Sequence, residues 1–351
     1  MGRCGRSSTA SCRSTTSPTP TPRCRREVCS ASSCCACDER AGQREPGDCC
    51  GSAASAGRSR SDLVSLQFVK LGGSLITDKT GEQSLERATL DRLAAEVAAA
   101  QTASPTALVV GHGSGSFGHV AAARTALRAA GAASPDRPID RPSATEVSEV
   151  QAAAHRLHAE VLKALRAAGV AAMSLPPSSW LTLQDGKVAN AGCGAVAQAL
   201  ELGLVPVVCG DVVLDSVRGA VICSTEEVFS VLVRGGGLAG RFTRALWMGR
   251  TDGLLVAGKR LDRIDETNVE SALAEAGGAL GVDVTGGMRH RVETLWSLAG
   301  EVGESWILDG GRPGVLEAAL GGRRLGGTCV GRAEPALGRP QAGPPPPFMS
   351  S

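Results

Sequence analysis

Apolar residues gather in short runs that alternate with alanine-rich stretches. The short runs predict buried strands, and the longer stretches predict helices. Strands are expected at 66–71, 106–110, 170–174, 205–209, 245–249, 305–308 and 327–331. Helices are expected at 86–101, 119–130, 144–168, 193–202, 226–233, 269–276, 288–299 and 313–320. This alternation is typical of an α/β sandwich on a largely parallel sheet, in which ligands bind at the carboxyl ends of the strands.

The composition separates a globular domain from two low-complexity ends. Residues 1–61 are rich in Ser, Thr and Pro, and the first sixty hold nine of the 13 cysteines and ten arginines but no lysine. With few large aliphatic side chains, this segment cannot bury enough apolar surface to offset its ordering entropy, so we expect it to be disordered. Its cysteines lack the spacing and partner histidines of a zinc finger, so no metal site is expected. Residues 62–332 form the predicted domain, and 333–351 a proline-rich tail.

Charge, aromatic content and cysteine placement exclude several classes of function. The net charge of +2, the absence of Tyr and an aromatic content of 3% argue against a nucleic-acid partner. No apolar run reaches the roughly eighteen residues of a membrane-spanning helix, so no membrane partner is expected. The four cysteines of the domain are scattered in apolar or glycine-rich surroundings, as reduced thiols are in the cytosol, and a cytoplasmic location is expected. They are Cys193, Cys209, Cys223 and Cys329.

The first glycine-rich loop follows the strand predicted at 66–71. Gly72 and Gly73 let the backbone turn sharply and expose its N–H groups, while Lys70 and Lys79 place a positive charge at each end of the turn. Bare N–H groups and lysines together can neutralise a polyphosphate, so the loop is a candidate phosphate site. The alternative is an ordinary strand–turn–helix connection with two solvated lysines.

A second glycine-rich loop follows the strand predicted at 106–110. It reads GHGSGSFGH over 111–119 and contains a GxGxxG pattern, which alone is weak evidence for a dinucleotide fold. That fold expects an acidic residue about twenty positions on, at the end of a strand, whereas Asp136 sits in a proline-flanked loop. Two strand–loop–helix units instead suggest two phosphate groups approached from two sides, as in a nucleotide donor and a phosphorylated acceptor.

Five motifs, in the same order, make the chain similar to a known family. They are VKLGGSLITDK (69–79), HGSGSFGH (112–119), VPVVCGDVVLD (205–215), DVTGGM (283–288) and LDGG with LGGT (308–328). Over about 64–332 the chain resembles the amino acid kinase superfamily and, within it, the isopentenyl phosphate kinases. The resemblance implies a three-layer αβα sandwich, with an acceptor-phosphate part at about 62–215 and a nucleotide part at about 216–332.

The resemblance also implies an activity. The γ-phosphoryl group of ATP would pass to isopentenyl phosphate, giving isopentenyl diphosphate and ADP for isoprenoid biosynthesis. The acceptor oxygen already belongs to an anionic phosphate, so no general base is required, and catalysis should come from positioning and electrostatics. Mg²⁺ is implied as the counter-ion of ATP, without a dedicated protein cage. Because the superfamily commonly forms dimers, a homodimer is a further expectation.

The resemblance assigns the transfer step to a few charged side chains. Lys70 would reach the bridging region between the two phosphates, and Lys79 would stabilise the transferring group. His119, placed at the start of a helix that favours an anion, would donate a ring N–H to the acceptor phosphate. Asp211 would lie between the two lysines and hold them in place; its alternative is a turn or N-cap aspartate. His112 is expected to be structural.

Backbone groups and further side chains complete the predicted site. Contacts to ATP are expected from Lys70, Gly72, Gly73, Ser74, Gly115, Asp252, Gly286, Gly287 and Arg291. Contacts to the acceptor phosphate are expected from Gly113, Ser114, His119 and Thr225. The isoprenoid tail needs an apolar pocket, which the resemblance places where Val147 and Val150 share one helix face. The family residues there are often bulkier, so longer prenyl phosphates are predicted to fit.

Four departures from the family pattern bear on this site. Ser114 replaces the middle glycine of its loop. Thr225 and Glu226 stand where the family has Gly and Asp, and Glu226 could disturb a polar network. The loop of Asp252 is one residue shorter, and Arg291 replaces a lysine, which keeps the charge but not its point geometry. The alternatives are therefore a kinase of the same fold for another small phosphate, phosphonate or carboxylate, and a catalytically weakened nucleotide-binding protein.

Overall fold

All of the residues that can be described lie between Ser65 and Arg332. The computed structural model describes residues 65–78, 81, 83–125, 127, 141–278, 287–323 and 326–332. The segments predicted to be disordered and proline-rich lie outside them, as do Lys79 and Gly286. The division of the domain near residue 215 stays a prediction.

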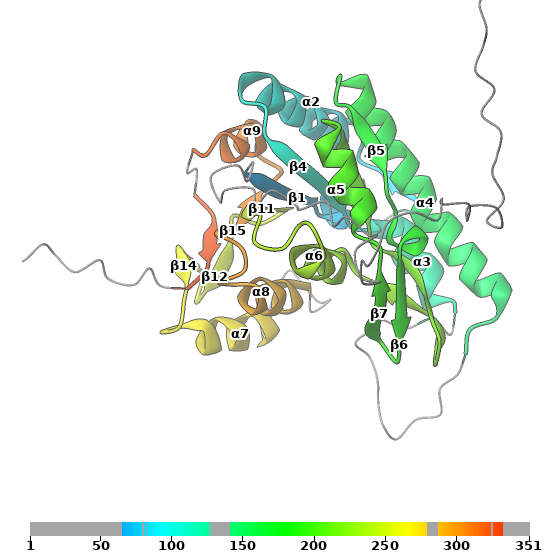
Figure 1. Ribbon diagram of the computed structural model, residues 1–351. Helices are drawn as coiled ribbons and strands as arrows, with labels where there is room; N and C mark the ends of the chain where they lie inside the picture. The colour runs from blue at the N-terminus through cyan, green and yellow to red at the C-terminus, as the bar shows by residue number, and fades with distance from the viewer. Residues whose placement is uncertain are drawn as a thin grey trace, which may run out of the picture. The chain divides into compact units, whose positions relative to one another are not determined.

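A largely parallel sheet forms the centre of the domain (Figure 1). Its strands are β1 (Leu66–Leu71), β4 (Ala107–His112), β5 (Ala172–Ser174), β8 (Val205–Cys209), β11 (Phe242–Gly249), β14 (Arg263–Ile264), β15 (Glu304–Asp309) and β16 (Thr328–Val330). They lie in the order β14-β16-β15-β11-β1-β4-β8-β5. Neighbours run parallel, except that β15 and β16 are antiparallel. The predicted α/β class and parallel sheet are confirmed, and β1 lies between β4 and β11.

Helices cover both faces of this sheet (Figure 1). On one face, α2 (Arg87–Ala103), α4 (Ala144–Ala167) and α9 (Val315–Leu320) share a core with Val69 and Leu71 of β1. On the other, α5 (Gly194–Glu201), α6 (Thr225–Arg234), α7 (Val269–Gly278) and α8 (Gly287–Ser297) share a core with Leu66 and Phe68. Side chains alternate along a strand, so Lys70 is on the face of Phe68, toward α6. None of the described helices combines the length and apolar character needed to cross a bilayer.

A smaller sheet was not predicted from the sequence. It consists of β6 (Leu181–Gln184), β7 (Lys187–Ala191), β9 (Asp211–Asp215) and β10 (Gly219–Cys223), in the order β10-β9-β6-β7. Only Gly210 separates β8 from β9, so the chain leaves the main sheet directly before Asp211. Two short hairpins were also missed: β2 (Thr77–Asp78) with β3 (Ser84–Leu85), and β12 (Leu254–Val256) with β13 (Lys259–Leu261).

The helix predicted at 119–130 begins earlier than expected. The observed helix, α3, spans Gly115–Ala123, so the second glycine loop forms its first turn. The N–H of Ser116 donates to Oγ1 of Thr77 at 3.0 Å, and this tertiary contact overrides the low helix propensity of glycine. A four-residue helix, α1 (Gly73–Ile76), also forms inside the first loop. The four cysteines of the domain are buried thiols, as predicted.

Candidate active site

The two glycine loops meet at the carboxyl ends of β1 and β4. The strands are in register, with Leu71 opposite His112, so the loops leave the sheet side by side. A Cβ atom on Gly73 would lie 2.4 Å from the backbone nitrogen of Gly115, and one on Gly113 would lie 2.9 Å from the nitrogen of Gly73. These distances are too short for any side chain, so the backbones are in direct contact.

Two of the predicted phosphate donors are already used by the fold. The N–H of Gly72 donates to the carbonyl of Met248 at 2.8 Å, and the N–H of Gly113 donates to the carbonyl of Leu71 at 3.0 Å. The hydrogen-bond ladder of the parallel sheet thus continues one residue beyond each strand. The predictions that these two N–H groups bind phosphate are therefore wrong.

Four other backbone N–H groups of the loops remain available. Those of Gly73, Ser74, Ser114 and Gly115 have no acceptor among the residues that the structure describes. Ser114 has φ −76° and ψ −13°, an ordinary right-handed conformation, so the serine strains nothing here. Gly115 has φ +50°, which favours glycine. Because buried or half-buried N–H groups normally have partners, this cluster is suited to bind an anion.

Thr77 holds the two loops together. Its hydroxyl donates to the carbonyl of Gly73 at 2.7 Å and accepts from the N–H of Ser116 at 3.0 Å. Arg250, which follows β11, donates from Nε to the carbonyl of Ser74. Both side chains were missed from the sequence, although Thr77 lies within the first motif. Their contacts fix the loop backbones without occupying the four available N–H groups.

A buried ion pair lies beside the loops. Lys70, at 7% exposure, is paired with Glu226 in the first turn of α6. The centroid of the Trp247 ring lies 5.2 Å from Nζ of Lys70. Burial lowers the pKa of Lys70 and outweighs the opposing attraction of Glu226, while the charge of Arg291 lowers it further. Burial alone would raise the pKa of Glu226, but Lys70 and Arg291 hold it below its ordinary value.

The predicted place of Asp211 is wrong. Its carboxylate accepts a hydrogen bond of 3.0 Å from Nε2 of His155 on α4, and that bond raises the pKa of His155. Burial would raise the pKa of Asp211, but His155 and backbone N–H donors hold it below its ordinary value. Because the chain leaves the main sheet before Asp211, the carboxylate turns toward α4. Glu226, which was predicted to disturb a polar network, pairs with Lys70 instead.

His119 and Thr225, two side chains predicted to contact the acceptor phosphate, lie in different surroundings. His119 is exposed in the second turn of α3, four residues after Gly115, and not at the helix start as expected. Thr225 is buried, and its hydroxyl donates to the carbonyl of His112 at 2.7 Å. The Thr225 side chain thus contacts the backbone of β4, which corrects the prediction that it contacts the acceptor phosphate.

The nucleotide-side residues lie in α8 and the loop after β11. Asp252 pairs with Arg260 at 2.6 Å and lies 3.9 Å from Arg312. Gly287 begins α8. Nη1 of Arg291 lies 3.4 Å from the position that a Cβ of Gly249 would take. The buried Nε of Arg291 has no hydrogen-bond partner within the described ranges, which fits an anionic oxygen of a nucleotide phosphate.

Comparisons with known proteins agree with this geometry. A model of the amino acid kinase family matches residues 65–307. The chain belongs to the amino acid kinase family. It is 34% identical over 278 residues to the isopentenyl phosphate kinase of Methanothermobacter thermautotrophicus, covering 75% of this chain and 98% of that protein. The isopentenyl phosphate kinase of Haloferax volcanii is 33% identical, covering 72% and 98% of the two chains.

A solved structure described as "X-ray structures of isopentenyl phosphate kinase" is 30% identical, with a TM-score of 0.58. It is covered completely, together with 76% of this chain. As a member of the amino acid kinase family, the chain is a phosphotransferase. Membership in this family takes the place of the dinucleotide-binding fold as the explanation of the GxGxxG pattern.

The predicted tail-binding residues of this kinase belong to a separate apolar cluster. Val150 is buried with Leu127, Val212 and Ala220, and Val147 packs against them. The cluster joins α4 to the β9–β10 hairpin beside α3. Small and β-branched residues dominate it. Which acceptor tails it admits stays a prediction.

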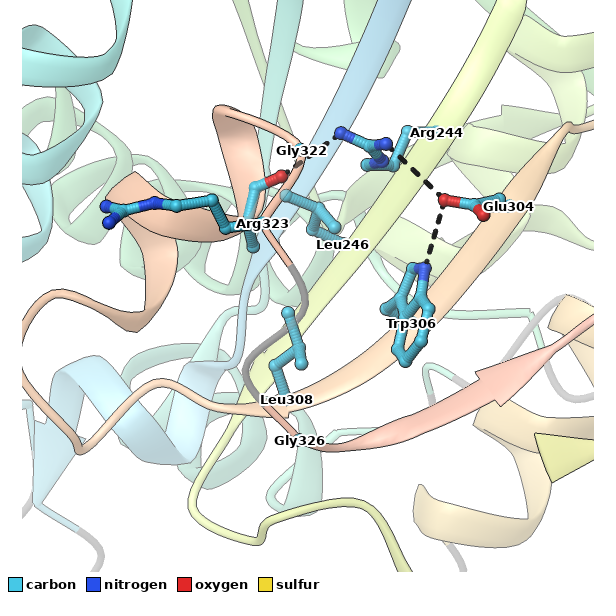
Figure 2. Close-up of a pocket in the computed structure, with 9 residues that line it drawn as sticks. Arg244, Leu246, Glu304, Trp306, Leu308, Gly322, Arg323 and Gly326 are labelled. Carbon is cyan, nitrogen blue, oxygen red and sulfur yellow. Dashed lines mark hydrogen bonds and ion pairs between the residues drawn. The ribbon is translucent and has the colours of Figure 1, made fainter. Parts of the chain in front are cut away.

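A hollow elsewhere in the kinase is not part of this site (Figure 2). It is lined by residues of β11, β15, α9 and the segment that follows α9, and its volume is about 20 Å³, room for little more than one water. Arg244 and Trp306 both donate to Glu304, each at 3.4 Å. Arg244 and Glu304 lie near the amino ends of their strands, away from the glycine loops at the carboxyl ends.

Proposed function

We propose that this kinase transfers the γ-phosphoryl group of ATP to isopentenyl phosphate, producing isopentenyl diphosphate and ADP. The observation that carries the proposal is the contact between two loops whose N–H groups are available beside the buried cation of Lys70. The named relatives, covered almost to their full length, support the same reaction.

The site suits transfer between two phosphates. An oxygen of the acceptor phosphate attacks the γ-phosphorus, and the bond from that phosphorus to the β-bridging oxygen breaks, leaving its electron pair on ADP. Negative charge crowds between donor and acceptor, so catalysis requires fixed positive charge and N–H donors. In this proposal the positive charge comes from Lys70 and Arg291, and the N–H donors are the four of the loops. His119 binds the acceptor phosphate, and Lys79 stabilises the transferring group. Because the acceptor oxygen is already anionic, the step needs no general base.

Further parts of the proposal concern ATP, Mg²⁺ and assembly. The glycine contacts and the unpaired Nε of Arg291 fit a polyphosphate at the ends of β1 and β11. Mg²⁺ would bind chiefly through the ATP phosphates and supply charge neutralisation. We further propose a cytoplasmic homodimer, whose mass light scattering would measure.

A panel of acceptors tests the proposal. Coupled ADP release would be followed with isopentenyl, dimethylallyl and geranyl phosphates, fosfomycin and a carboxylate. Isopentenyl phosphate should give the highest kcat/KM, and Lys70→Met should lower it by about a hundredfold or more. Lys259→Met, on the exposed hairpin strand β13, is the matched control and should leave the rate unchanged. A higher kcat/KM for another acceptor would reassign the substrate, and nucleotide binding without turnover would indicate the weakened binding protein.

A further inference from the structure

A chain of buried polar side chains runs beneath the second glycine loop. His112 ends β4, His158 lies on α4 and Ser174 ends β5. Nε2 of His112 lies 2.9 Å from Nδ1 of His158, and Nε2 of His158 lies 2.9 Å from Oγ of Ser174. At the other end, Nδ1 of His112 lies 3.1 Å from the carbonyl oxygen of Gly113. None of these contacts is used in the proposed transfer step.

The chemistry of the four groups gives the chain one direction. A carbonyl oxygen only accepts, so Nδ1 of His112 must carry a hydrogen. Burial lowers the pKa of His112 to about 3 and that of His158 to about 4, so each ring is neutral and carries one hydrogen. Nε2 of His112 therefore accepts, Nδ1 of His158 donates to it, and Nε2 of His158 accepts from the Ser174 hydroxyl. Every nitrogen then has one complementary partner.

This direction fixes a peptide group of the active site. In a trans peptide the C=O and the following N–H point in opposite directions. The carbonyl of Gly113 faces the His112 ring, so the N–H of Ser114 faces away from it. That N–H is one of the four available donors of the loops. The carbonyl of His112 itself accepts from Thr225 at 2.7 Å and from the N–H of Gly210 at 3.2 Å, so His112 is held from both sides.

We propose that His158 is a positioning residue for the acceptor: through His112 it orients the Gly113–Ser114 peptide so that the Ser114 N–H faces the acceptor phosphate. The proposal rests on the proposed function only for the identity of that phosphate. His158 does not contact the transferring group itself. Its contribution is to select the tautomer and orientation of His112, which a buried apolar residue at position 158 could not do.

A bound metal is the competing explanation. His112, His158 and Cys209 offer donor atoms that all lie within 4.8 Å of one another, and these donor types suit zinc. A metal between the two rings would replace the His158–His112 hydrogen bond. The complete chain of donors and acceptors satisfies both rings without a metal, so we favour the hydrogen-bonded arrangement and treat zinc as an outcome of the test.

The first measurement uses the unmodified protein and does not depend on turnover. Long-range ¹H–¹⁵N spectra of the imidazole rings report which nitrogen carries the hydrogen. With 5 histidines in the chain, single substitutions assign the signals. His112 and His158 should both appear as the neutral Nδ1–H tautomer, and elemental analysis should find no stoichiometric zinc. An Nε2–H tautomer at His112, or one zinc per chain, would overturn the proposal even if isopentenyl phosphate proved not to be the acceptor.

The second measurement compares replacements of His158. His158→Phe removes the donor to His112, whereas the amide of His158→Asn can supply an N–H at the Nδ1 position. His158→Phe should lower kcat/KM for the acceptor at least tenfold and change the KM for ATP less than twofold. His158→Asn should recover acceptor kcat/KM to within about threefold of the parent. His290→Asn, at an exposed site on α8, is the control. Equal losses for ATP and acceptor, or no recovery with Asn, would show a merely structural histidine.

Discussion

The ammonium group of Lys70, on the central strand, is held by the carboxylate of Glu226 in the first turn of α6. Both side chains are almost fully buried, so their charges are poorly screened. Burying two charges costs free energy that their attraction barely offsets, so such a pair is weak evidence for stability. We interpret it as a device that keeps a cation at a fixed point beside the glycine loops.

Removing the negative partner should be costly. Glu226→Gln leaves the buried Lys70 cation without a counter-charge, and we expect the free energy of unfolding to fall by about 3 kcal/mol. Urea unfolding measures the change. Glu201→Gln, at an exposed site at the end of α5, should stay within about 0.5 kcal/mol of the parent. Equal stability of the two variants would mean that the pair is not formed in solution.

Replacing the whole pair separates stability from function. Lys70→Met combined with Glu226→Leu removes both charges and keeps their volume roughly constant. We expect unfolding free energy within about 1 kcal/mol of the parent, because apolar replacements of a buried pair are often neutral. ADP release should nevertheless be lost. Turnover near the parental rate in this folded double variant would contradict the role given to Lys70.

The contact between the loops can be tested with one methyl group. Gly73→Ala would place a Cβ 2.4 Å from the nitrogen of Gly115, so the loops must separate, and we expect turnover to fall about a hundredfold or more. Gly194→Ala, in the first turn of α5, has nothing within 4 Å of the new Cβ. It should keep full turnover, and its free energy of unfolding should stay within about 0.5 kcal/mol of the parent. A fully active Gly73→Ala variant would show that loop contact is dispensable.

Replacing His119 should affect the kinetics of the acceptor more than those of ATP. If its ring N–H binds the acceptor phosphate, His119→Ala should lower acceptor kcat/KM about ten- to a hundredfold, the range for a hydrogen bond to a charged group. The KM for ATP should change less than twofold. Initial rates with each substrate varied in turn measure both, with His290→Ala as the control. A change confined to ATP would place His119 on the nucleotide side.

Acid should destabilise the kinase through its buried histidines. The pKa values of His112 and His158 are about 3 and about 4 in the folded chain, against 6.5 for ordinary histidine. Between pH 6.5 and 5 the unfolded chain therefore binds protons that the folded chain does not, so stability falls as pH falls. Each ring contributes up to about 1.4 kcal/mol per pH unit.

Three neighbouring groups modify this titration without reversing it. Asp211 raises the pKa of both rings, and Arg166 lowers that of His158. The raised pKa of His155 contributes stability that is present below pH 6.5 and lost above it. Urea unfolding from pH 5 to 8 should show the fall, and His158→Gln should reduce its slope by about one proton. An unchanged slope in that variant would mean that His158 titrates in the folded protein.

The limits of sequence-based prediction are clearest around residues 205–215. The apolar run to Cys209 correctly predicted a strand, and strand–helix alternation correctly predicted a largely parallel sheet. The pattern did not reveal that the chain enters a second sheet after Gly210, because β9 also has an apolar centre and follows β8 after a single residue. That turn decides which carboxylate meets Lys70. Likewise the ladder bonds that occupy the N–H groups of Gly72 and Gly113 depend on neighbouring strands that are distant in the sequence.

The sequence predicted which residues belong to the site better than it predicted which residues they contact. The two loops and Lys70 come together because parallel strands bring their carboxyl ends to one edge, whereas Arg291 comes from α8. Glu226 was noticed only as a departure, since nothing in its local sequence shows that a lysine 156 residues away is its partner. The His112–His158 contact spans 46 residues and left no recognisable spacing.

Consecutive residues at the start of α6 attach to the two halves of the reaction: Thr225 to the end of β4 and Glu226 to Lys70 on β1. A mutation in this helical turn is therefore expected to change the binding of both ATP and the acceptor. Evolution toward a new acceptor would be expected to proceed through paired substitutions at these two positions. Libraries that randomise them together should yield active combinations that neither position gives alone.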